Sequence, residues 1–190
     1  MRVEKGELMR PESEAWEILD TAEQICSAVV VSNAVRRLAD EITAELKDRH
    51  PLVLSVMGGA VIFSGQLLPL LRFPLELDYI HASRYRNRTQ GEQLEWKVLP
   101  KDSVAGRIVL VVDDILDEGH TLAAIRDKLL SLGAAKCYSA VFAEKSLTQA
   151  KPVRADFVGL TLPDRYVFGF GMDVYGLWRN LPAIYALRQK

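Results

Sequence analysis

The sequence has few cysteines, no long apolar run and almost no net charge. Cys26 and Cys137 are its two cysteines, and they are far apart without metal-ligand spacing, so neither a disulfide nor a thiolate metal site is expected. The apolar runs are too short to span a membrane, and the charged opening residues lack the apolar core of a signal peptide. A net charge of -1 over 190 residues gives no sign of a basic surface for nucleic acid or anionic lipid. We therefore expect a cytoplasmic protein with no nucleic-acid or membrane partner.

Apolar residues recur with the spacings of helices and strands. With 49% hydrophobic residues, the 190 residues can bury a sizeable core, which favours a single domain over 1–190. Ser32 is a candidate N-cap for a helix that ends before His50, and residues 60–71 have the pattern of a second helix. Strands are expected at 52–57, 75–80, 109–112 and 135–143. This alternation predicts an α/β fold with a doubly wound, mainly parallel sheet flanked by helices.

The most informative segment is the apolar run 109–112, which ends in acidic residues and is followed by a helix start. The uninterrupted run is typical of a strand that is buried on both faces. Thr121 begins the spacing of an amphipathic helix, and Gly133 is the expected C-cap. Ligands of parallel sheets bind beyond the carboxyl ends of the strands, and the amides of a helix N-terminus favour phosphate. The loop between strand and helix is therefore a candidate ligand site.

Four acidic residues in this segment narrow the choice of ligand: Asp113, Asp114, Asp117 and Glu118. Carboxylates repel phosphate, but they accept hydrogen bonds from sugar hydroxyls and hold Mg²⁺ through water. Phosphoribosyl pyrophosphate combines a ribose, a 5′-phosphate and a metal-bound pyrophosphate, so it is the predicted ligand, with Mg²⁺. The alternative is that the acids only cap the next helix and face solvent.

Residues 113–121 resemble the sugar-phosphate loop of the type I phosphoribosyltransferases. The resemblance implies that Asp113 and Asp114 bind the ribose hydroxyls and that Asp117 is the catalytic residue, exchanging a proton with the base. Backbone amides of 117–121 would take the 5′-phosphate, and the full set would be Asp113, Asp114, Asp117, Glu118, Gly119, His120 and Thr121. Glu118 stands where the family usually has a small hydroxyl residue, so its side chain is expected to turn away from the phosphate.

Two further loops follow expected strands. The glycine pair at Gly58 and Gly59 lets backbone amides approach an anion, although such pairs often only make a turn. The resemblance implies pyrophosphate binding by Met57 and Gly58, without the lysine that is frequent at the position of Met57. Residues 83–92 are long and polar, either an exposed hairpin or a lid that excludes water from the reaction. The resemblance favours a lid with Arg84 and Tyr85 at its root.

The C-terminal part resembles the base-binding end of hypoxanthine-guanine phosphoribosyltransferases. Five positions carry this second resemblance: Lys145, Tyr166, Val167, Asp173 and Arg179. It implies that Lys145 donates to the exocyclic oxygen of a 6-oxopurine, that Tyr166 stacks on the ring, and that the Val167 backbone bonds the pyrimidine edge. Arg179 would contact pyrophosphate, and Asp173 would help Asp114 to hold Mg²⁺.

The chemistry of Lys145 agrees with this role, because an ammonium has only donors and prefers a carbonyl oxygen to the amino group of adenine. Taken alone, however, Lys145 is as well explained as a solvated lysine at a strand end. By the same standard Asp173 and Arg179 are a surface ion pair of little energetic weight. His50 and His81 have no candidate metal-ligand partner nearby in the sequence, so both are expected at ordinary surface or interior positions.

Together the resemblances imply Mg²⁺-dependent phosphoribosyl transfer to hypoxanthine or guanine, giving IMP or GMP and pyrophosphate. They also imply a core over roughly 32–160, a small hood from the N-terminal segment and roughly 161–190, and a homodimer or homotetramer. One alternative is that the base is xanthine or adenine. Another is a regulator that kept the sugar-phosphate site but binds RNA, which the near-neutral charge disfavours.

Overall fold

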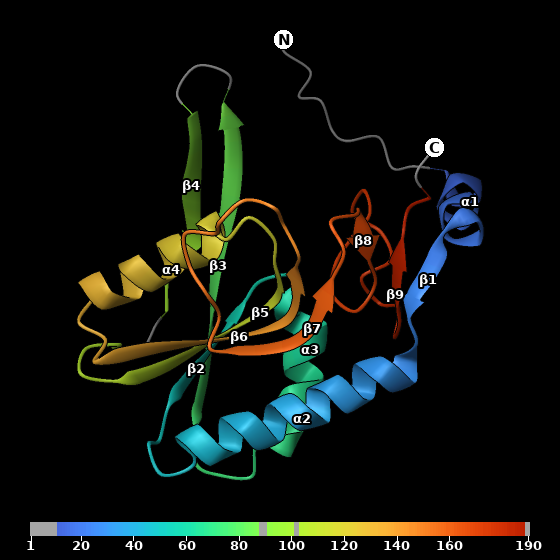
Figure 1. Cartoon of the computed structure of the whole chain (residues 1–190). Coiled ribbons are helices and arrows are strands. Elements are labelled where there is room, and N and C mark those ends of the chain that lie inside the picture. Colours follow the sequence, from blue (N-terminus) through green and yellow to red (C-terminus); the bar gives the residue numbers. More distant parts are fainter. Residues whose placement is uncertain (1–10, 88–90, 101–102, 189–190) are drawn as a thin grey trace.

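A six-stranded sheet forms the centre of the computed structural model, which describes residues 11–87, 91–100 and 103–188, without the side chains of 83–93. The strand order is β4-β3-β2-β5-β6-β7 (Figure 1). All neighbouring strands run parallel except β4, which is antiparallel to β3. The strands are β2 (Leu52–Val56), β3 (Glu76–Asn87), β4 (Gly91–Val98), β5 (Ile108–Leu116), β6 (Lys136–Lys145) and β7 (Phe157–Leu162).

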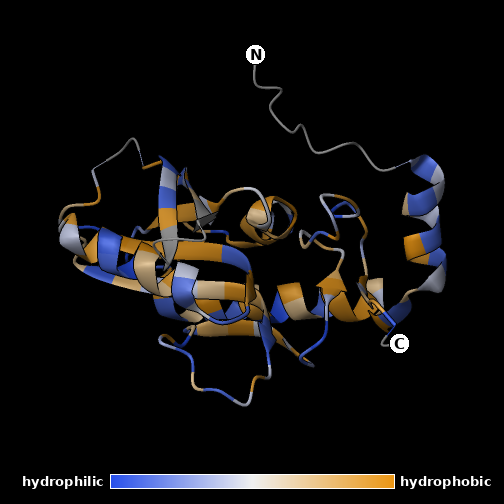
Figure 2. Ribbon diagram, turned by 90° about the horizontal axis from the view of Figure 1, so that it is seen from above, coloured by the Kyte–Doolittle hydropathy of each residue, from blue (hydrophilic) through white to orange (hydrophobic). Residues whose placement is uncertain are grey.

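Helices cover both faces of this sheet, as side-chain alternation along the strands requires. In β5, Leu110 and Val112 belong to the apolar cluster that includes α2 (Ala28–Leu46) and α3 (Ala60–Leu67). Val109 and Val111 belong to the opposite cluster, which includes α4 (His120–Ser131). The central strands are accordingly coloured mostly as hydrophobic in Figure 2. The predicted α/β fold with a mainly parallel sheet is confirmed.

The ends of two helices differ from the sequence prediction. α2 begins four residues before Ser32, because the Ser27 side chain accepts a hydrogen bond from the Val30 amide at 3.4 Å and caps the helix. α3 ends at Leu67 and continues only as a 3-10 turn (Leu68–Leu70), since Pro69 has no amide hydrogen for a further helical bond.

The prediction for the end of α4 is confirmed. Gly133 adopts a φ of 90°, a left-handed conformation that favours glycine. Its amide donates to Leu130 O at 3.0 Å, and the Ala134 amide donates to Leu129 O at 3.1 Å, which together form a Schellman cap. This cap turns the chain into β6.

A second, three-stranded sheet joins the two ends of the chain. It contains β1 (Glu23–Cys26), β9 (Ile184–Ala186) and β8 (Val167–Phe168) in that order, all antiparallel. We call this sheet and the segments around it the hood; it stands beside the central sheet in Figure 1. A short helix, α1 (Glu12–Thr21), precedes β1, and its Ala15 carbonyl accepts a hydrogen bond from Trp178 Nε1 at 3.0 Å. The division at about residues 32 and 160 stays a prediction.

The described part of the polar segment 83–92 is strand, because β3 runs on through Asn87 and β4 begins at Gly91. Its backbone pairs with β4, placing Arg84 opposite Leu94 and Tyr85 opposite Gln93. Residues 88–90 and the side chains of Arg84 and Tyr85 lie outside the described part of the chain, so their predicted lid role is untested.

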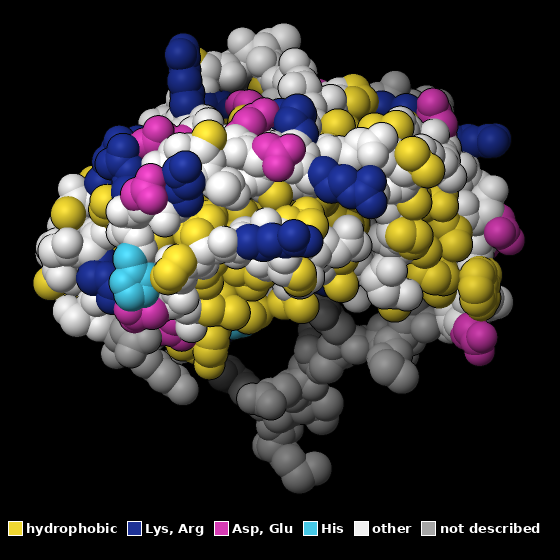
Figure 3. Space-filling view, turned by 90° about the horizontal axis from the view of Figure 1, so that it is seen from below, with side chains coloured by type: hydrophobic (Ala, Val, Ile, Leu, Met, Phe, Trp, Pro, Cys, Tyr) yellow, Lys and Arg dark blue, Asp and Glu magenta, His cyan; other side chains and the backbone are white. Residues whose placement is uncertain are grey.

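The face seen from below in Figure 3 has a broad area of hydrophobic side chains. Exposed apolar residues lie on α2, α3 and β3, where Val29, Val61 and Leu77 are 68%, 47% and 55% exposed. Within the described residues, no helix combines the length and the apolar character needed to cross a bilayer.

Candidate active site

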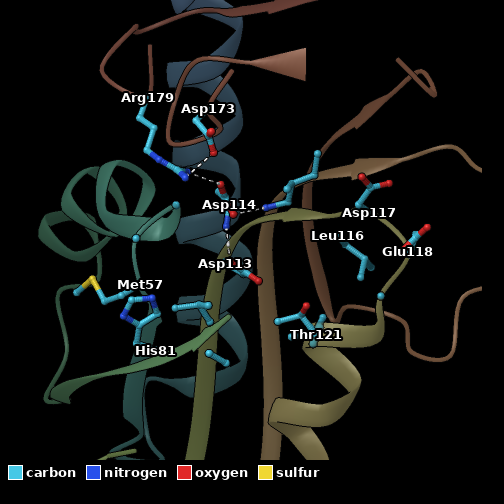
Figure 4. A pocket seen from close by; sticks show the side chains of 17 residues that line it. Met57, His81, Asp113, Asp114, Leu116, Asp117, Glu118, Thr121, Asp173 and Arg179 are labelled. Atoms are coloured by element: carbon cyan, nitrogen blue, oxygen red, sulfur yellow. Dashed lines mark hydrogen bonds and ion pairs between the residues drawn. The ribbon is translucent and has the colours of Figure 1, made fainter. Parts of the chain in front are cut away.

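A cavity of about 520 Å³ opens at the carboxyl ends of β2 and β5 and is also lined by His81 and Ala82 from within β3. In Figure 4, Asp113 and Asp114 of β5 lie close to Asp173 and Arg179 of the hood, and Thr121 lies at the start of α4. The lining includes Met57, Gly58, Gly59, His81, Asp113, Asp114, Asp117, Glu118, Gly119, Thr121, Asp173 and Arg179. The structure thus brings together residues predicted for sugar, phosphate, pyrophosphate and metal.

Asp113 and Asp114 lie within β5, and not in a loop after it, because the strand continues to Leu116. They are nearly buried: Asp113 is 8% exposed and the Asp114 side chain 13%. The Asp114 amide donates to Asp113 Oδ1 at 3.0 Å, and the Ile115 amide donates to Asp114 Oδ1 at 3.0 Å. The interpretation that these acids merely face solvent is wrong for this pair.

Burial dominates the protonation of both carboxyls. It raises the pKa of Asp113 well above the ordinary 3.8, and the neighbouring Asp114 charge raises this pKa further. Burial also raises the pKa of Asp114, opposed by its hydrogen bond with Asp113 and by the Arg179 charge. Because the folded chain holds the Asp113 proton more tightly than the unfolded chain, the free energy of unfolding falls as pH rises from 3.8 through the raised pKa. The pair therefore destabilises the fold at neutral pH.

The turn after β2 fits closely against Asp114. A Cβ at Gly59 would lie 2.6 Å from Asp114 Oδ1 and closer still to Oδ2. Gly171 of the hood has a φ of 102°, and a Cβ there would come within 3.2 Å of the Gly59 carbonyl carbon. Within the turn after β2, the peptide bond between Met57 and Gly58 is cis. The turn, the strand end and the hood thus meet with no room for a side chain at either glycine.

The turn 117–119, which we call the phosphate turn because it is predicted to bind phosphate, ends at the start of α4. Gly119 has a φ of 87° and is the N-cap, so the helix begins at His120, one residue before the predicted Thr121. Glycine offers no side chain to cap the first-turn amides, which suits a bound phosphate. In Figure 4 the Glu118 side chain points away from Asp113 and Thr121, as expected for a residue that must leave room for an anion.

A second cavity of about 210 Å³ adjoins the first. Lys145 Nζ donates to Asp117 Oδ2 at 2.8 Å on its wall, with the side chains 13% and 45% exposed. Tyr166, 49% exposed, and Val167 also line this cavity. Asp114, Ile115, Asp117 and Asp173 line both cavities, so the two form one continuous site.

Arg179 connects the hood to the buried acids. Its guanidinium lies 2.5 Å from Asp173 Oδ1 and 4.0 Å from Asp114 Oδ2, and it donates to Gly171 O at 2.5 Å. Among the described residues no group of three or more His, Cys, Asp or Glu side chains could hold a metal. Mg²⁺ commonly binds one or two carboxylates and takes its other ligands from water and substrate phosphates. The oxygen donors of Asp114 and Asp173 fit that mode.

His81 is a titratable cavity residue that sequence reasoning missed. It lies within β3, directly after Ile80, which pairs with Val56 at the carboxyl end of β2, so it stands level with the strand end where ligands bind (Figure 4). Its position directly after a predicted strand was the available signal. His50, in contrast, lies 3.7 Å from Glu76 at an exposed position, as expected.

Buried acids at a strand end beside an uncapped helix start suit a phosphorylated sugar. The family model for the phosphoribosyl transferase domain matches residues 22–175. The chain therefore belongs to the phosphoribosyltransferase family, and the resemblance found in the sequence is confirmed.

Particular relatives narrow the comparison. The chain is 34% identical to a hypoxanthine-guanine-xanthine phosphoribosyltransferase of Tritrichomonas foetus over 160 residues, 84% of this chain and 87% of that protein. It is 33% identical to the hypoxanthine-guanine phosphoribosyltransferase of Bacillus subtilis over 172 residues, 89% of this chain and 94% of that protein. A solved hypoxanthine-guanine-xanthine phosphoribosyltransferase superposes with a TM-score of 0.81 at 31% identity, covering 90% of this chain and 99% of the other.

A longer relative also matches. The chain is 34% identical to the bifunctional protein TilS/HprT of Listeria innocua over 172 residues, 89% of this chain, but it spans only 26% of that protein's length.

Proposed function

We propose that this chain transfers the phosphoribosyl group of phosphoribosyl pyrophosphate to hypoxanthine or guanine, giving IMP or GMP and pyrophosphate in purine salvage. One observation carries the proposal: the Lys145–Asp117 pair stands where the acid-lined cavity meets the second cavity. A donor for a 6-oxo group and a carboxylate for a ring nitrogen thus border the place where sugar and base would join. Relatives named for this activity over most of the chain support it.

We expect different residues of the first cavity to bind different parts of phosphoribosyl pyrophosphate. Asp113 and Asp114 accept hydrogen bonds from the ribose hydroxyls and fix the ring. The amides of 117–121 and the Thr121 hydroxyl bind the 5′-phosphate at the α4 start. The amides of Met57 and Gly58, with Arg179, bind the leaving pyrophosphate, so no lysine is required at Met57. Arg84 and Tyr85 belong to a lid that shields the reacting sugar from water.

The base would occupy the second cavity. Lys145 donates to the exocyclic oxygen, Tyr166 stacks on the ring, and the Val167 backbone bonds the pyrimidine edge. The purine nitrogen attacks the anomeric carbon as pyrophosphate leaves, and the Asp117 carboxylate accepts the proton of the base. Without ligand, Lys145 satisfies Asp117; on binding, the base takes a place beside both groups.

Mg²⁺ is the proposed cofactor, and Asp114 and Asp173 are the residues that would hold it through oxygen or bound water. When bound, it neutralises charge on the pyrophosphate. Arg179 already contacts both carboxylates, so the same three side chains serve metal and pyrophosphate.

The decisive assay incubates the chain with phosphoribosyl pyrophosphate and Mg²⁺ and with hypoxanthine, guanine, xanthine or adenine separately. Nucleotide formation with hypoxanthine or guanine, and little with adenine, is the expected result. Xanthine is a serious alternative because one relative is named for it. Absence of nucleotide with every base refutes the proposal and leaves the RNA-binding regulator, whose test is RNA retention on a filter.

A homodimer or homotetramer is the proposed assembly. The broad apolar area of Figure 3 suits burial against a second copy. Light scattering tests this. The cytoplasmic location stays a prediction.

A further inference from the structure

Lys151 is a nearly buried lysine outside every predicted site. It lies in the connection between β6 and β7, and its side chain is 10% exposed. Nζ donates to Leu116 O at 3.1 Å, to Lys145 O at 2.6 Å and to Glu144 Oε1 at 3.1 Å. An ammonium has three donors, so these bonds use all of them. A nearly buried ammonium whose three donors are all hydrogen-bonded is held in one position.

The bonds of Lys151 span the point where two site segments separate. β5 and β6 are paired up to Leu116 and Glu144. Beyond this pair, β5 leads into the phosphate turn and β6 leads to Lys145 at the second cavity. The carbonyls of Leu116 and Lys145 lie at this fork. Lys151 bridges them and so extends the strand pairing beyond its last ladder step.

Packing alone does not fix this region. Lys145 lines the base cavity on one side and a further cavity of about 350 Å³ on the other, which Lys151 also lines. The placement of Lys145 therefore depends on two bonds: the ion pair from its side chain to Asp117, and the hydrogen bond that its backbone carbonyl accepts from Lys151 Nζ. Behind the phosphate turn, a Cβ at Gly119 would lie 3.4 Å from Lys151 Cβ and from Pro152 Cδ. The same segment thus backs both halves of the site.

We propose that Lys151 is a positioning residue that holds Lys145 and Asp117 in register for the purine base. It touches neither substrate; it acts by tying the carbonyl before Asp117 to the carbonyl of Lys145. This role rests on the proposed function. Loss of the tie lets the two side chains drift apart, which weakens base binding more than sugar binding.

Lys151→Met tests this role, because methionine keeps the Cβ behind Gly119 and nearly the same stem but donates no hydrogen bond. We expect the KM for hypoxanthine to rise at least about threefold and the KM for phosphoribosyl pyrophosphate to stay within about twofold, since misplacement confined to the base groups costs base binding. The matched control is Lys136→Met at the other end of β6, where the lysine donates to Tyr138 Oη at 2.6 Å. Both constants should stay within about twofold in that variant.

A merely structural role would lower the melting temperature and the active fraction of Lys151→Met but leave both KM values unchanged. A rise in the hypoxanthine KM of less than about threefold therefore overturns the proposal, whatever happens to stability. Should this variant not fold, Lys151→Gln replaces it under the same criterion, because its amide is too short to reach both carbonyls. An inactive parent chain instead refutes the proposed function, and this role with it.

Discussion

Gly59→Ala is the sharpest test of the fit between the β2 turn and Asp114. Gly59 has helical backbone angles, φ -65° and ψ -44°, so alanine meets no backbone strain there. The new methyl group would nevertheless lie 2.6 Å from Asp114 Oδ1 and closer to Oδ2, whereas ordinary contact begins at 3.4 Å. The Gly59 backbone cannot retreat, because Gly171 packs against its carbonyl group. The Asp114 carboxylate must therefore move.

The required movement sets the size of the effect. Asp114 has to shift by roughly 1 Å to restore van der Waals contact. A misplacement of that size costs about 100-fold in rate, or about 2.7 kcal/mol of transition-state stabilisation. We expect kcat/KM for phosphoribosyl pyrophosphate to fall by this factor in steady-state assays, with the far-UV circular dichroism unchanged.

Gly65→Ala in α3 is the matched control, because a Cβ there would meet no described atom within 4 Å. It should leave the kinetics unchanged and stabilise the helix by about 0.5–1 kcal/mol. If Gly59→Ala keeps kcat/KM within about threefold of the parent, the reasoning is refuted, because the carboxylate would then not need its present position.

Three further outcomes are expected. Asp117→Asn should lower kcat by about 100-fold or more and leave the KM for phosphoribosyl pyrophosphate within about twofold, because the amide cannot accept the proton of the base; unchanged turnover contradicts this. Lys145→Gln should reduce the preference for hypoxanthine over adenine, since an amide both donates and accepts; an unaltered ratio of kcat/KM values contradicts it. Asp113→Asn should raise the melting temperature at pH 7 and flatten its decline between pH 4 and 7, because the parent loses stability as pH rises through the raised pKa of Asp113. Parallel melting curves for parent and variant would exclude that cause.

Most of the central sheet could be predicted from short-range patterns in the sequence. Runs such as 109–112 and the helical spacing after Thr121 depend on burial of nearby residues, which the sequence shows directly. The hood strands could not be found in this way. β8 and β9 have two and three residues, and Glu23 pairs with Ala186 from the other end of the chain. Pairing over such a distance leaves no local periodicity.

The candidate site was partly predictable for a similar reason. Parallel strands bring their carboxyl ends to one edge, so the acids near the end of β5 and the glycines after the neighbouring β2 had to meet. The same rule brings His81, level with the end of β2, to this edge, and it was overlooked. No such rule predicts the position of Lys151, because this position depends on the path of the connection between β6 and β7, which carries no periodic pattern.

The buried acids show why the site and the fold make opposing demands. Burial at the end of an apolar strand raises the cost of ionising both carboxyls, the Asp114 charge adds to that cost for Asp113, and Arg179 approaches Asp114 only to 4.0 Å. Two apolar side chains in place of the carboxyls would give a higher free energy of unfolding. The arrangement makes physical sense when ribose hydroxyls donate to the carboxylates and a cation lies beside them, since both favour the ionised forms. Under the proposed function, the ligand would supply the favourable partners that these carboxylates lack in the fold alone, and its binding energy would be concentrated at the end of β5.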